Sequence, residues 1–221
     1  MQLSAHCFSS QLWEASVGYT PTYSRWYRSR DQEFGYRCIK IFLKLIDFQR
    51  GITTSATRRW VLKTPQHSAH IPAIKAVFPD AVVVLTSRNP VNILRSLLPL
   101  LSYALGVQND AVDLHPFGAA WVERLHAMMT SQKKDAALFP HAIQTAFETF
   151  TSSADATMQL VVDICEQAGL STTEETLRPI REFVQSEKIA KSGGSRKTFK
   201  YDLSVFGVDE EEVAKQFATL W

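Results

Sequence analysis

The chain has 221 residues, of which 45% are hydrophobic and 21% charged, the composition of one domain with a sizeable buried core. Lys and Arg number 24 against 22 Asp and Glu, and the net charge of +2 excludes a strong global field for nucleic acid or an anionic membrane. The nine glycines build neither G-x-G-x-x-G nor G-x-x-x-x-G-K-S/T, so both standard glycine-rich phosphate cradles are excluded.

The three cysteines, Cys7, Cys38 and Cys165, lie far apart in the sequence and form no C-x-x-C pair. This spacing predicts neither a zinc site nor a disulfide framework. Residues 1–18 lack the pattern of a signal peptide, and the longest apolar stretch, 93–105, is interrupted and too short to span a bilayer. We therefore expect a cytoplasmic protein with no membrane span, no metal and no nucleic-acid partner.

The first quarter of the chain is predicted to be helical. Residues 8–30 are rich in aromatic side chains and favour short helices with a break at Pro21. Asp31 is a plausible N-cap for an amphipathic helix over 32–50. The apolar side chains that predict this helix, at spacings of three and four, are Phe34, Cys38, Ile41, Phe42, Leu45 and Phe48. A loop is expected over 51–58.

The pattern then changes to short apolar runs typical of strands. Residues 60–62 predict a short strand that ends at Lys63, and 67–78 predict a helix. The unbroken β-branched run over 81–85 predicts a strand buried on both faces, as in a parallel sheet. About twenty residues separate the two strand centres, which suits a right-handed βαβ crossover.

The rest of the chain is predicted to be mostly helical. Asn89 is a good N-cap and Pro90 suits the first position of a helix that runs to about residue 105. Further helices are expected over 113–134, 151–168, 171–188 and 209–221, with a weak strand over 142–147 and a basic loop over 191–200. Because no linker or repeat divides the sequence, we expect residues 1–221 to form a single α/β domain.

The two predicted strands end in cations, Lys63 and Arg88. In open α/β sheets the ligand site lies beyond the carboxyl ends of the strands, so both cations are expected to face the same crevice. The free N–H groups of the helix after Arg88 also favour an anion, and Ser96 lies about two turns into that helix. An alternative interpretation is that Arg88 and the Asn-Pro pair only shape the strand-to-helix turn.

Three blocks of residues follow one another in a distinctive order. They are WVLKTPQH at 60–67 with FPDA at 78–81, SRNP at 87–90 and Ser96; P-x-Y-x-x-W at 21–26; and KYDLSVFGVDE at 200–210 with Phe217. Together these blocks resemble the PAPS-dependent sulfotransferase superfamily, especially its microbial branch, in which PAPS donates the sulfuryl group. The resemblance implies an α/β, sulfotransferase-like (P-loop-NTPase-like) three-layer fold with a reduced parallel sheet and many helices.

The resemblance also implies roles for individual residues. Arg88 and Ser96 would hold the 3′-phosphate of the nucleotide, which a guanidinium fork and a hydroxyl suit well. Lys63 would offset the negative charge of the leaving oxygen, and His67 is the nearest candidate base for an acceptor hydroxyl. An alternative interpretation of His67 is a residue that caps the start of a helix.

Two further basic residues, Arg196 and Lys197, resemble an R-K-G element that contacts the nucleotide. The alternative is that they belong to a solvated basic loop. The family also has a P-R-S/T-G-T loop that binds the 5′-phosphosulfate, and this sequence does not contain it. The resemblance therefore implies an N-terminally truncated member, whose sheet edge an oligomer or a complementing chain would cover.

Three functions are consistent with these observations. The first is a sulfotransferase that moves a sulfuryl group from PAPS to a hydroxyl or amine of a small apolar acceptor. The second is a sulfotransferase-derived protein without sulfation activity, which binds a small molecule or performs a different reaction in the old acceptor cleft. The third is a structural partner whose open sheet edge pairs with another chain.

Overall fold

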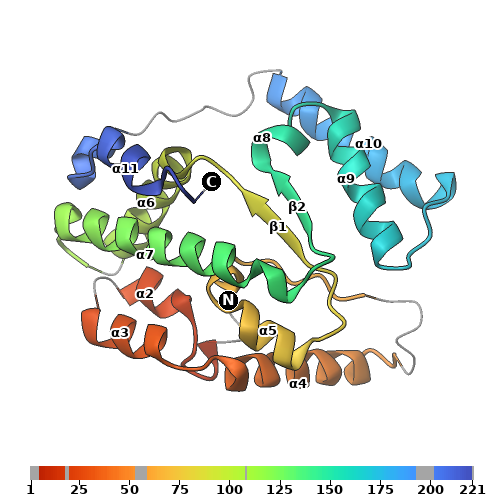
Figure 1. The fold of residues 1–221 in the computed structure, drawn as a ribbon, viewed down its shortest axis with the longest axis horizontal. Helices are drawn as coiled ribbons and strands as arrows, with labels where there is room; N and C mark the ends of the chain where they lie inside the picture. Colours follow the sequence, from red (N-terminus) through yellow and green to blue (C-terminus); the bar gives the residue numbers. More distant parts are fainter. Residues whose placement is uncertain (1–4, 18–19, 53–58, 108, 193–201, 221) are drawn as a thin grey trace.

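The computed structural model describes residues 5–17, 20–52, 59–107, 109–192 and 202–220. α-Helices dominate these residues (Figure 1). The α-helices are α2 (Gln11–Val17), α3 (Pro21–Ser29), α4 (Glu33–Gln49), α5 (Ile71–Val77), α6 (Pro90–Gly106), α7 (Leu114–Asp135), α8 (Phe147–Phe150), α9 (Ala154–Gln167), α10 (Glu174–Ser192) and α11 (Glu210–Phe217). The strands are β1 (Val84–Ser87) and β2 (Ile143–Ala146), and the short 3-10 helices are η2 (Pro65–Ala69), η3 (Ala136–Leu138) and η4 (Leu203–Phe206). Most of the loop predicted at 51–58, and of the one at 191–200, lies outside the described residues.

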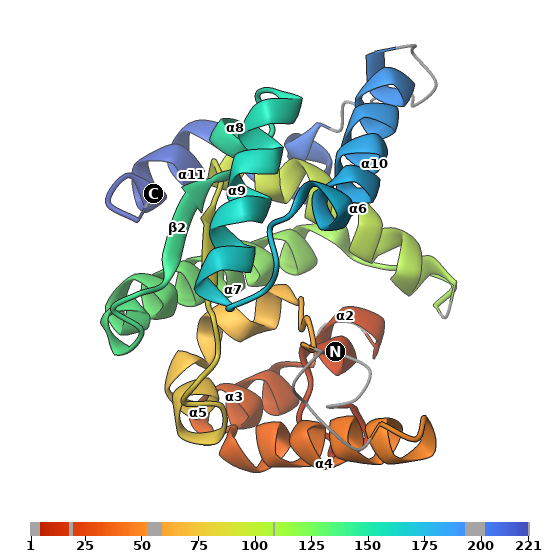
Figure 2. The same cartoon turned by 90° about the vertical axis from the view of Figure 1, so that its right-hand side faces the viewer.

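The sheet is a parallel pair at the centre of the molecule. Val84 of β1 lies opposite Ile143 of β2, and Ser87 lies opposite Ala146. The connection from β1 to β2 runs through α6 and α7. Helices α8, α9 and α10 follow β2 and lie on the side of β2 that faces away from β1 (Figures 1 and 2). The strand predicted at 81–85 is confirmed as β1, which begins and ends slightly later. Its side chains are half-buried or exposed instead of buried on both faces. The weak strand predicted at 142–147 is confirmed as β2.

The strand predicted at 60–62 is wrong. In the described part of the chain the sheet consists of β1 and β2, and residues 59–64 pair with neither. Val61 is 86% exposed, and the indole N–H of Trp60 donates to the Asp47 carboxylate over 3.0 Å. A short apolar run becomes a strand only where a neighbouring strand offers a ladder of hydrogen bonds, and none is provided here.

Two apolar clusters hold the helices together. The larger one joins α6, α7, η4 and α11, and its most buried members are Leu94, Leu98, Leu105, Leu203 and Phe217. The smaller one packs α4 against α5. Helix starts follow the predicted caps, since Asn89 Oδ1 accepts from the Val91 N–H over 2.9 Å and Asp209 Oδ1 accepts from the Glu211 N–H over 2.8 Å.

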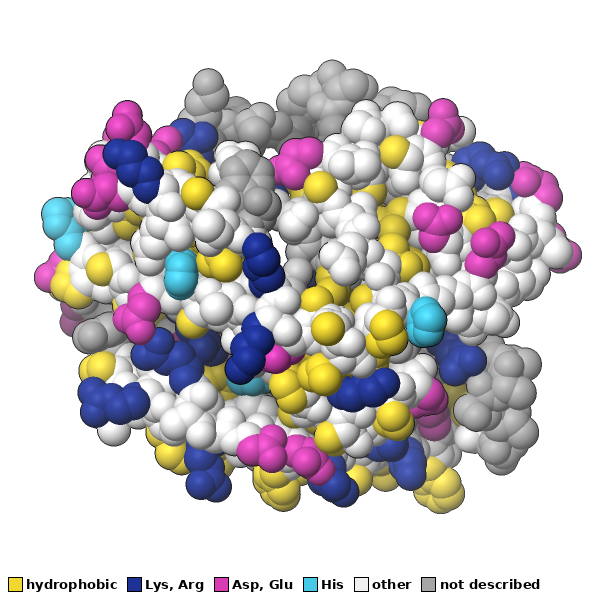
Figure 3. Space-filling model, in the orientation of Figure 1, with side chains coloured by type: hydrophobic (Ala, Val, Ile, Leu, Met, Phe, Trp, Pro, Cys, Tyr) yellow, Lys and Arg dark blue, Asp and Glu magenta, His cyan; other side chains and the backbone are white. Residues whose placement is uncertain are grey.

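The helix predicted over 32–50 is confirmed as α4, although the predicted apolar face is largely the solvent-facing one. The buried face consists of Tyr36, Ile39 and Leu43, which pack towards α5. Phe34, Ile41, Leu45 and Phe48 are exposed instead. Figure 3 shows apolar side chains interleaved with Lys and Arg along the lower edge of the molecule, where α4 runs. Apolar residues therefore surround this helix, and periodicity alone selected the wrong side.

Candidate functional site

Arg88 lies at the carboxyl end of the sheet, as predicted. It follows the last residue of β1, and the register that sets Ser87 opposite Ala146 places it beside Phe147, the residue after β2. The guanidinium carbon lies 4.3 Å from the centre of the Phe147 ring. Arg88 Nε is buried and has no hydrogen-bond partner among the described residues. A donor oriented in this way by a cation–π contact is suited to bind an anion.

The start of α6 does not offer the free N–H groups that the sequence predicted for an anion. Val91 and Asn92 donate to Asn89 Oδ1, Ile93 donates to the Asn89 carbonyl oxygen, and Pro90 has no N–H. Ser96 lies on this helix and is exposed, one turn beyond Asn92 on the same face. The neighbouring cation Arg95 is already engaged, because it forms two hydrogen bonds to the Glu210 carboxylate of α11, of 2.8 and 2.6 Å. Arg88 is therefore the arginine of this region with a donor to spare.

Lys63 is exposed on the extended segment that leads into η2. The prediction that it shares a crevice with Arg88 rested on the strand at 60–62, which does not form, and the described residues show no contact between the two side chains. The next residue, Thr64, has a buried hydroxyl that lacks a hydrogen-bond partner in the structure as described.

His67 lies in η2 and is held by a tyrosine of α4. The Tyr36 hydroxyl lies 2.7 Å from His67 Nδ1. Burial lowers the pKa of His67 to about 4, so the imidazole is neutral at pH 7, and burial raises the pKa of Tyr36 far above its usual range. Donation of the Tyr36 proton to Nδ1 would leave the ring proton on Nε2. In this arrangement His67 presents a hydrogen-bond donor.

A second tyrosine–histidine pair lies beside the first, and sequence reasoning assigned it no role. The Tyr27 hydroxyl lies 2.8 Å from Nε2 of the buried His70. Burial lowers the pKa of His70 to about 4 as well. Tyr27, Tyr36, Gln66 and His70 line a cavity of about 10 Å³, which holds no ligand larger than a water molecule. No local pattern signals this pair, because its members are 43 residues apart in the sequence.

The two buried histidines predict a loss of stability at acidic pH. Each has a pKa of about 4 in the folded protein and an ordinary value of 6.5, so the unfolded chain binds protons that the native state refuses between these pH values. The free energy of unfolding should therefore fall as the pH decreases from about 6.5 to about 4, by on the order of 3 kcal/mol per histidine.

Urea unfolding of the His70→Gln variant across this pH range tests this prediction. The variant should show a shallower dependence on pH than the unmodified protein, because Gln accepts a hydrogen bond without titrating. The exposed His141 provides the control, since His141→Gln should leave the pH dependence unchanged. Parallel curves for the His70→Gln variant and the unmodified protein would refute the assignment.

The remaining site predictions are not visible in the structure. Arg196 and Lys197 lie outside the described residues. The described part of the chain contains no group of three or more His, Cys, Asp or Glu side chains that could hold a metal ion. Among the helices that the structure describes, none combines the length and apolar character needed to cross a membrane.

The sequence and the fold define a member of the sulfotransferase family. The sequence model of the sulfotransferase family matches residues 1–174, and the chain therefore belongs to this family, as the motif blocks predicted. The crystal structure of sulfotransferase STF1 from Mycobacterium tuberculosis is similar over 99% of this chain, with a TM-score of 0.76 and 22% sequence identity. This similarity confirms the predicted α/β sulfotransferase-like fold. The chain spans 54% of the length of that protein. No curated protein matches the sequence.

Proposed function

We propose that this protein binds PAPS and transfers a sulfuryl group to a hydroxyl or amine of a small apolar acceptor. Membership of the sulfotransferase family supports this reaction class. The observation that carries the nucleotide assignment is the Nε of Arg88 at the carboxyl end of β1, which is buried and has no hydrogen-bond partner among the described residues. An orphaned guanidinium donor fits a phosphate group in particular.

The proposed roles follow from these positions. Arg88 and Ser96 hold the 3′-phosphate of the nucleotide, and Lys63 offsets negative charge near the sulfuryl group that PAPS supplies when bound. The resemblance implied that His67 is the base, but a hydrogen bond from Tyr36 to Nδ1 favours a different role, donation from Nε2 to an oxygen of the ligand. Arg196 and Lys197 complete the nucleotide site in this proposal, which treats residues 1–221 as one domain.

Replacing Arg88 with Ala tests the nucleotide site. Binding of PAP, the desulfated nucleotide, should weaken by about tenfold to a hundredfold, because a charge-assisted hydrogen bond to phosphate is lost. Isothermal titration calorimetry measures the change in dissociation constant. Arg95→Ala is the matched control, since Arg95 lies on α6, shortly after Arg88 in the sequence, but is paired with Glu210, and this variant should bind PAP normally. Equal affinities for the unmodified protein and Arg88→Ala would rule out the 3′-phosphate assignment.

A second candidate function is a sulfotransferase-derived protein that binds the nucleotide or a small molecule without sulfation. Lys63 supports this candidate, because it is exposed and makes no contact with Arg88 among the described residues, so the group proposed to offset charge during transfer is not held in place. Incubation with PAPS and a panel of phenols, alcohols and amines distinguishes the two functions. Release of PAP that depends on the acceptor supports transfer, whereas tight PAP binding without release supports the second function.

A further inference from the structure

Residues 5–10, the N-terminal segment, lie antiparallel along α4, and three contacts fix the register. The rings of His6 and Phe42 lie 5.6 Å apart. Ser9 Oγ donates to Gln32 Oε1, and a Cβ built on Gly35 would lie 3.4 Å from Ser9 Cβ. Residue numbers therefore rise along the segment as they fall along α4.

This register places Cys7 against Cys38. Cys7 lies between His6 and Ser9, and Cys38 lies between Phe42 and Gly35, one helical turn from each. The two side chains are close enough for Cys38 to contribute to the raised pKa of Cys7, and both residues are half-buried. Cys165 lies on α9, which is separated from α4 in both views of the ribbon (Figures 1 and 2). The structure thus brings together two of the three cysteines, which lie far apart in the sequence.

We propose that Cys7 and Cys38 are a redox pair that closes to a disulfide in the presence of a small disulfide oxidant such as oxidised glutathione. The two protein thiols become one S–S bond, and the oxidant is reduced to two thiols, which take up the two protons and the two electrons. The bond ties the N-terminal segment to α4.

The order of the two exchange steps follows from the surroundings of Cys7. Burial, and then the neighbouring Cys38 side chain, raise the pKa of the Cys7 thiol to about 11. Cys7 is therefore a poor first nucleophile, and Cys38 attacks the oxidant. Cys38 becomes the mixed disulfide and releases the first small thiol. Cys7 then loses its proton, attacks the Cys38 sulfur and releases the second.

Oxidation would reinforce contacts that surround His67. The Gln11 N–H, four residues after Cys7, donates to Gln66 Oε1 over 3.2 Å, and Gln66 precedes His67. Tyr36, which binds His67, precedes Cys38 by two residues on α4. A bond between Cys7 and Cys38 therefore joins the two segments that hold this histidine. The pair itself depends on the packing of α4 and not on the proposed transfer reaction.

Thiol counting under denaturing conditions tests the pair directly. After equilibration with oxidised glutathione, the unmodified protein should retain one reactive thiol, and peptide mapping should find Cys7 linked to Cys38 with the loss of two hydrogen atoms. Cys7→Ser should accumulate glutathione on Cys38, because the resolving thiol is missing. Cys165→Ser, the matched control, should still form the bond. Three free thiols, stable glutathione adducts on the unmodified protein, or a link that includes Cys165 would each overturn the proposal.

Thermal unfolding provides a second readout. A bond that closes the chain between residues 7 and 38 should raise the melting temperature by roughly 5–15 °C, and a reductant should reverse the rise. Cys165→Ser should show the same rise, and Cys38→Ser should show none. An oxidised protein that melts at the temperature of the reduced one would contradict the native geometry of the bond, whatever the outcome of the nucleotide-binding test.

Discussion

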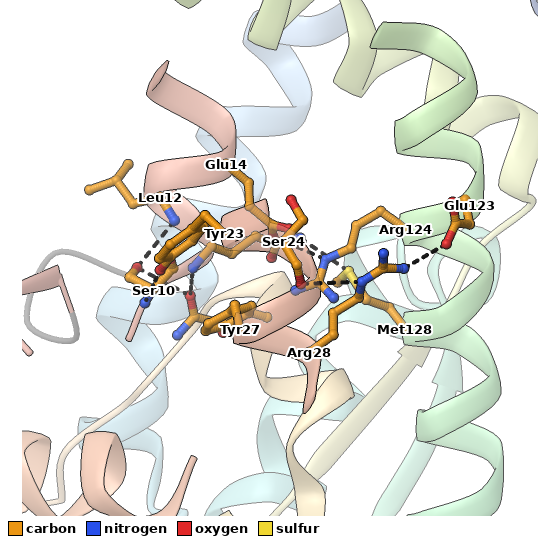
Figure 4. A network of polar contacts seen from close by, with 12 residues as sticks. Ser10, Leu12, Glu14, Tyr23, Ser24, Tyr27, Arg28, Glu123, Arg124 and Met128 are labelled. Atoms are coloured by element: carbon orange, nitrogen blue, oxygen red, sulfur yellow. Dashed lines mark hydrogen bonds and ion pairs between the residues drawn. The ribbon is translucent and has the colours of Figure 1, made fainter. Parts of the chain in front are cut away.

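Replacement of Arg124 with Ala is expected to destabilise the folded protein by about 3–5 kcal/mol. Arg124 of α7 pairs with Glu14 of α2, with Nε and Oε2 3.2 Å apart and both side chains only 7% exposed. The guanidinium carbon also lies 5.2 Å from the centre of the Tyr27 ring (Figure 4). Truncation of Arg124 would leave the Glu14 carboxylate buried without a countercharge, and the desolvation of that charge is what makes the loss large.

Arg28 offers a matched control in the same network (Figure 4). It pairs with Glu123 over 2.7 Å, but the Glu123 side chain is 69% exposed, so Arg28→Ala should cost less than about 1 kcal/mol. A double variant, Arg124→Met with Glu14→Leu, should recover most of the stability, because it removes both buried charges at once. Urea unfolding followed by circular dichroism measures all three. If Arg124→Ala cost no more than Arg28→Ala, the pair would not be buried in solution.

The parts of the fold that sequence predicted correctly are those specified by neighbouring residues. The start of α6 depends only on Asn89 and Pro90, and the start of α11 depends only on Asp209. Local side-chain chemistry therefore predicts where both helices begin. The prediction of a strand at 60–62 was wrong because a strand forms only beside a partner strand, and no local sequence pattern shows whether one is present. The apolar face of α4 could not be predicted for a similar reason, since the position of α5 decides which apolar side chains of α4 are buried.

The candidate site divides in the same way. The position of Arg88 could be predicted from the sequence because the end of a β-branched run followed by Asn-Pro marks the carboxyl end of a strand. The partners that tune the other polar groups were not found, because each contact joins distant segments: Tyr36 binds His67, and Glu14 pairs with Arg124. The resemblance therefore suggested a base at His67, whereas the tyrosine that binds its ring could be seen only in three dimensions.

Gly118 is the position where a single methyl group should do the most damage to the core. It lies in α7 where the helix meets η4, and a Cβ added there would lie 2.2 Å from the Phe206 carbonyl oxygen and 2.9 Å from Phe206 Cβ. The obstacle is mainly backbone, and Gly207, with a φ of 64°, ends η4 immediately afterwards. Gly118→Ala should therefore destabilise the protein by about 3 kcal/mol, even though Ala is favoured over Gly within a helix by about 1 kcal/mol.

Gly106→Ala separates the steric effect from helix propensity. Gly106 is the last residue of α6, and a Cβ there would meet no atom within 4 Å, so this variant should be neutral or slightly more stable. Both variants are compared by urea unfolding. The comparison also bears on the family block at 200–210, because η4 forms the centre of that block. The short distance between η4 and α7 requires a helix position without a side chain, which Gly118 provides. If Gly118→Ala were as stable as Gly106→Ala, η4 would not be packed against α7 at this distance.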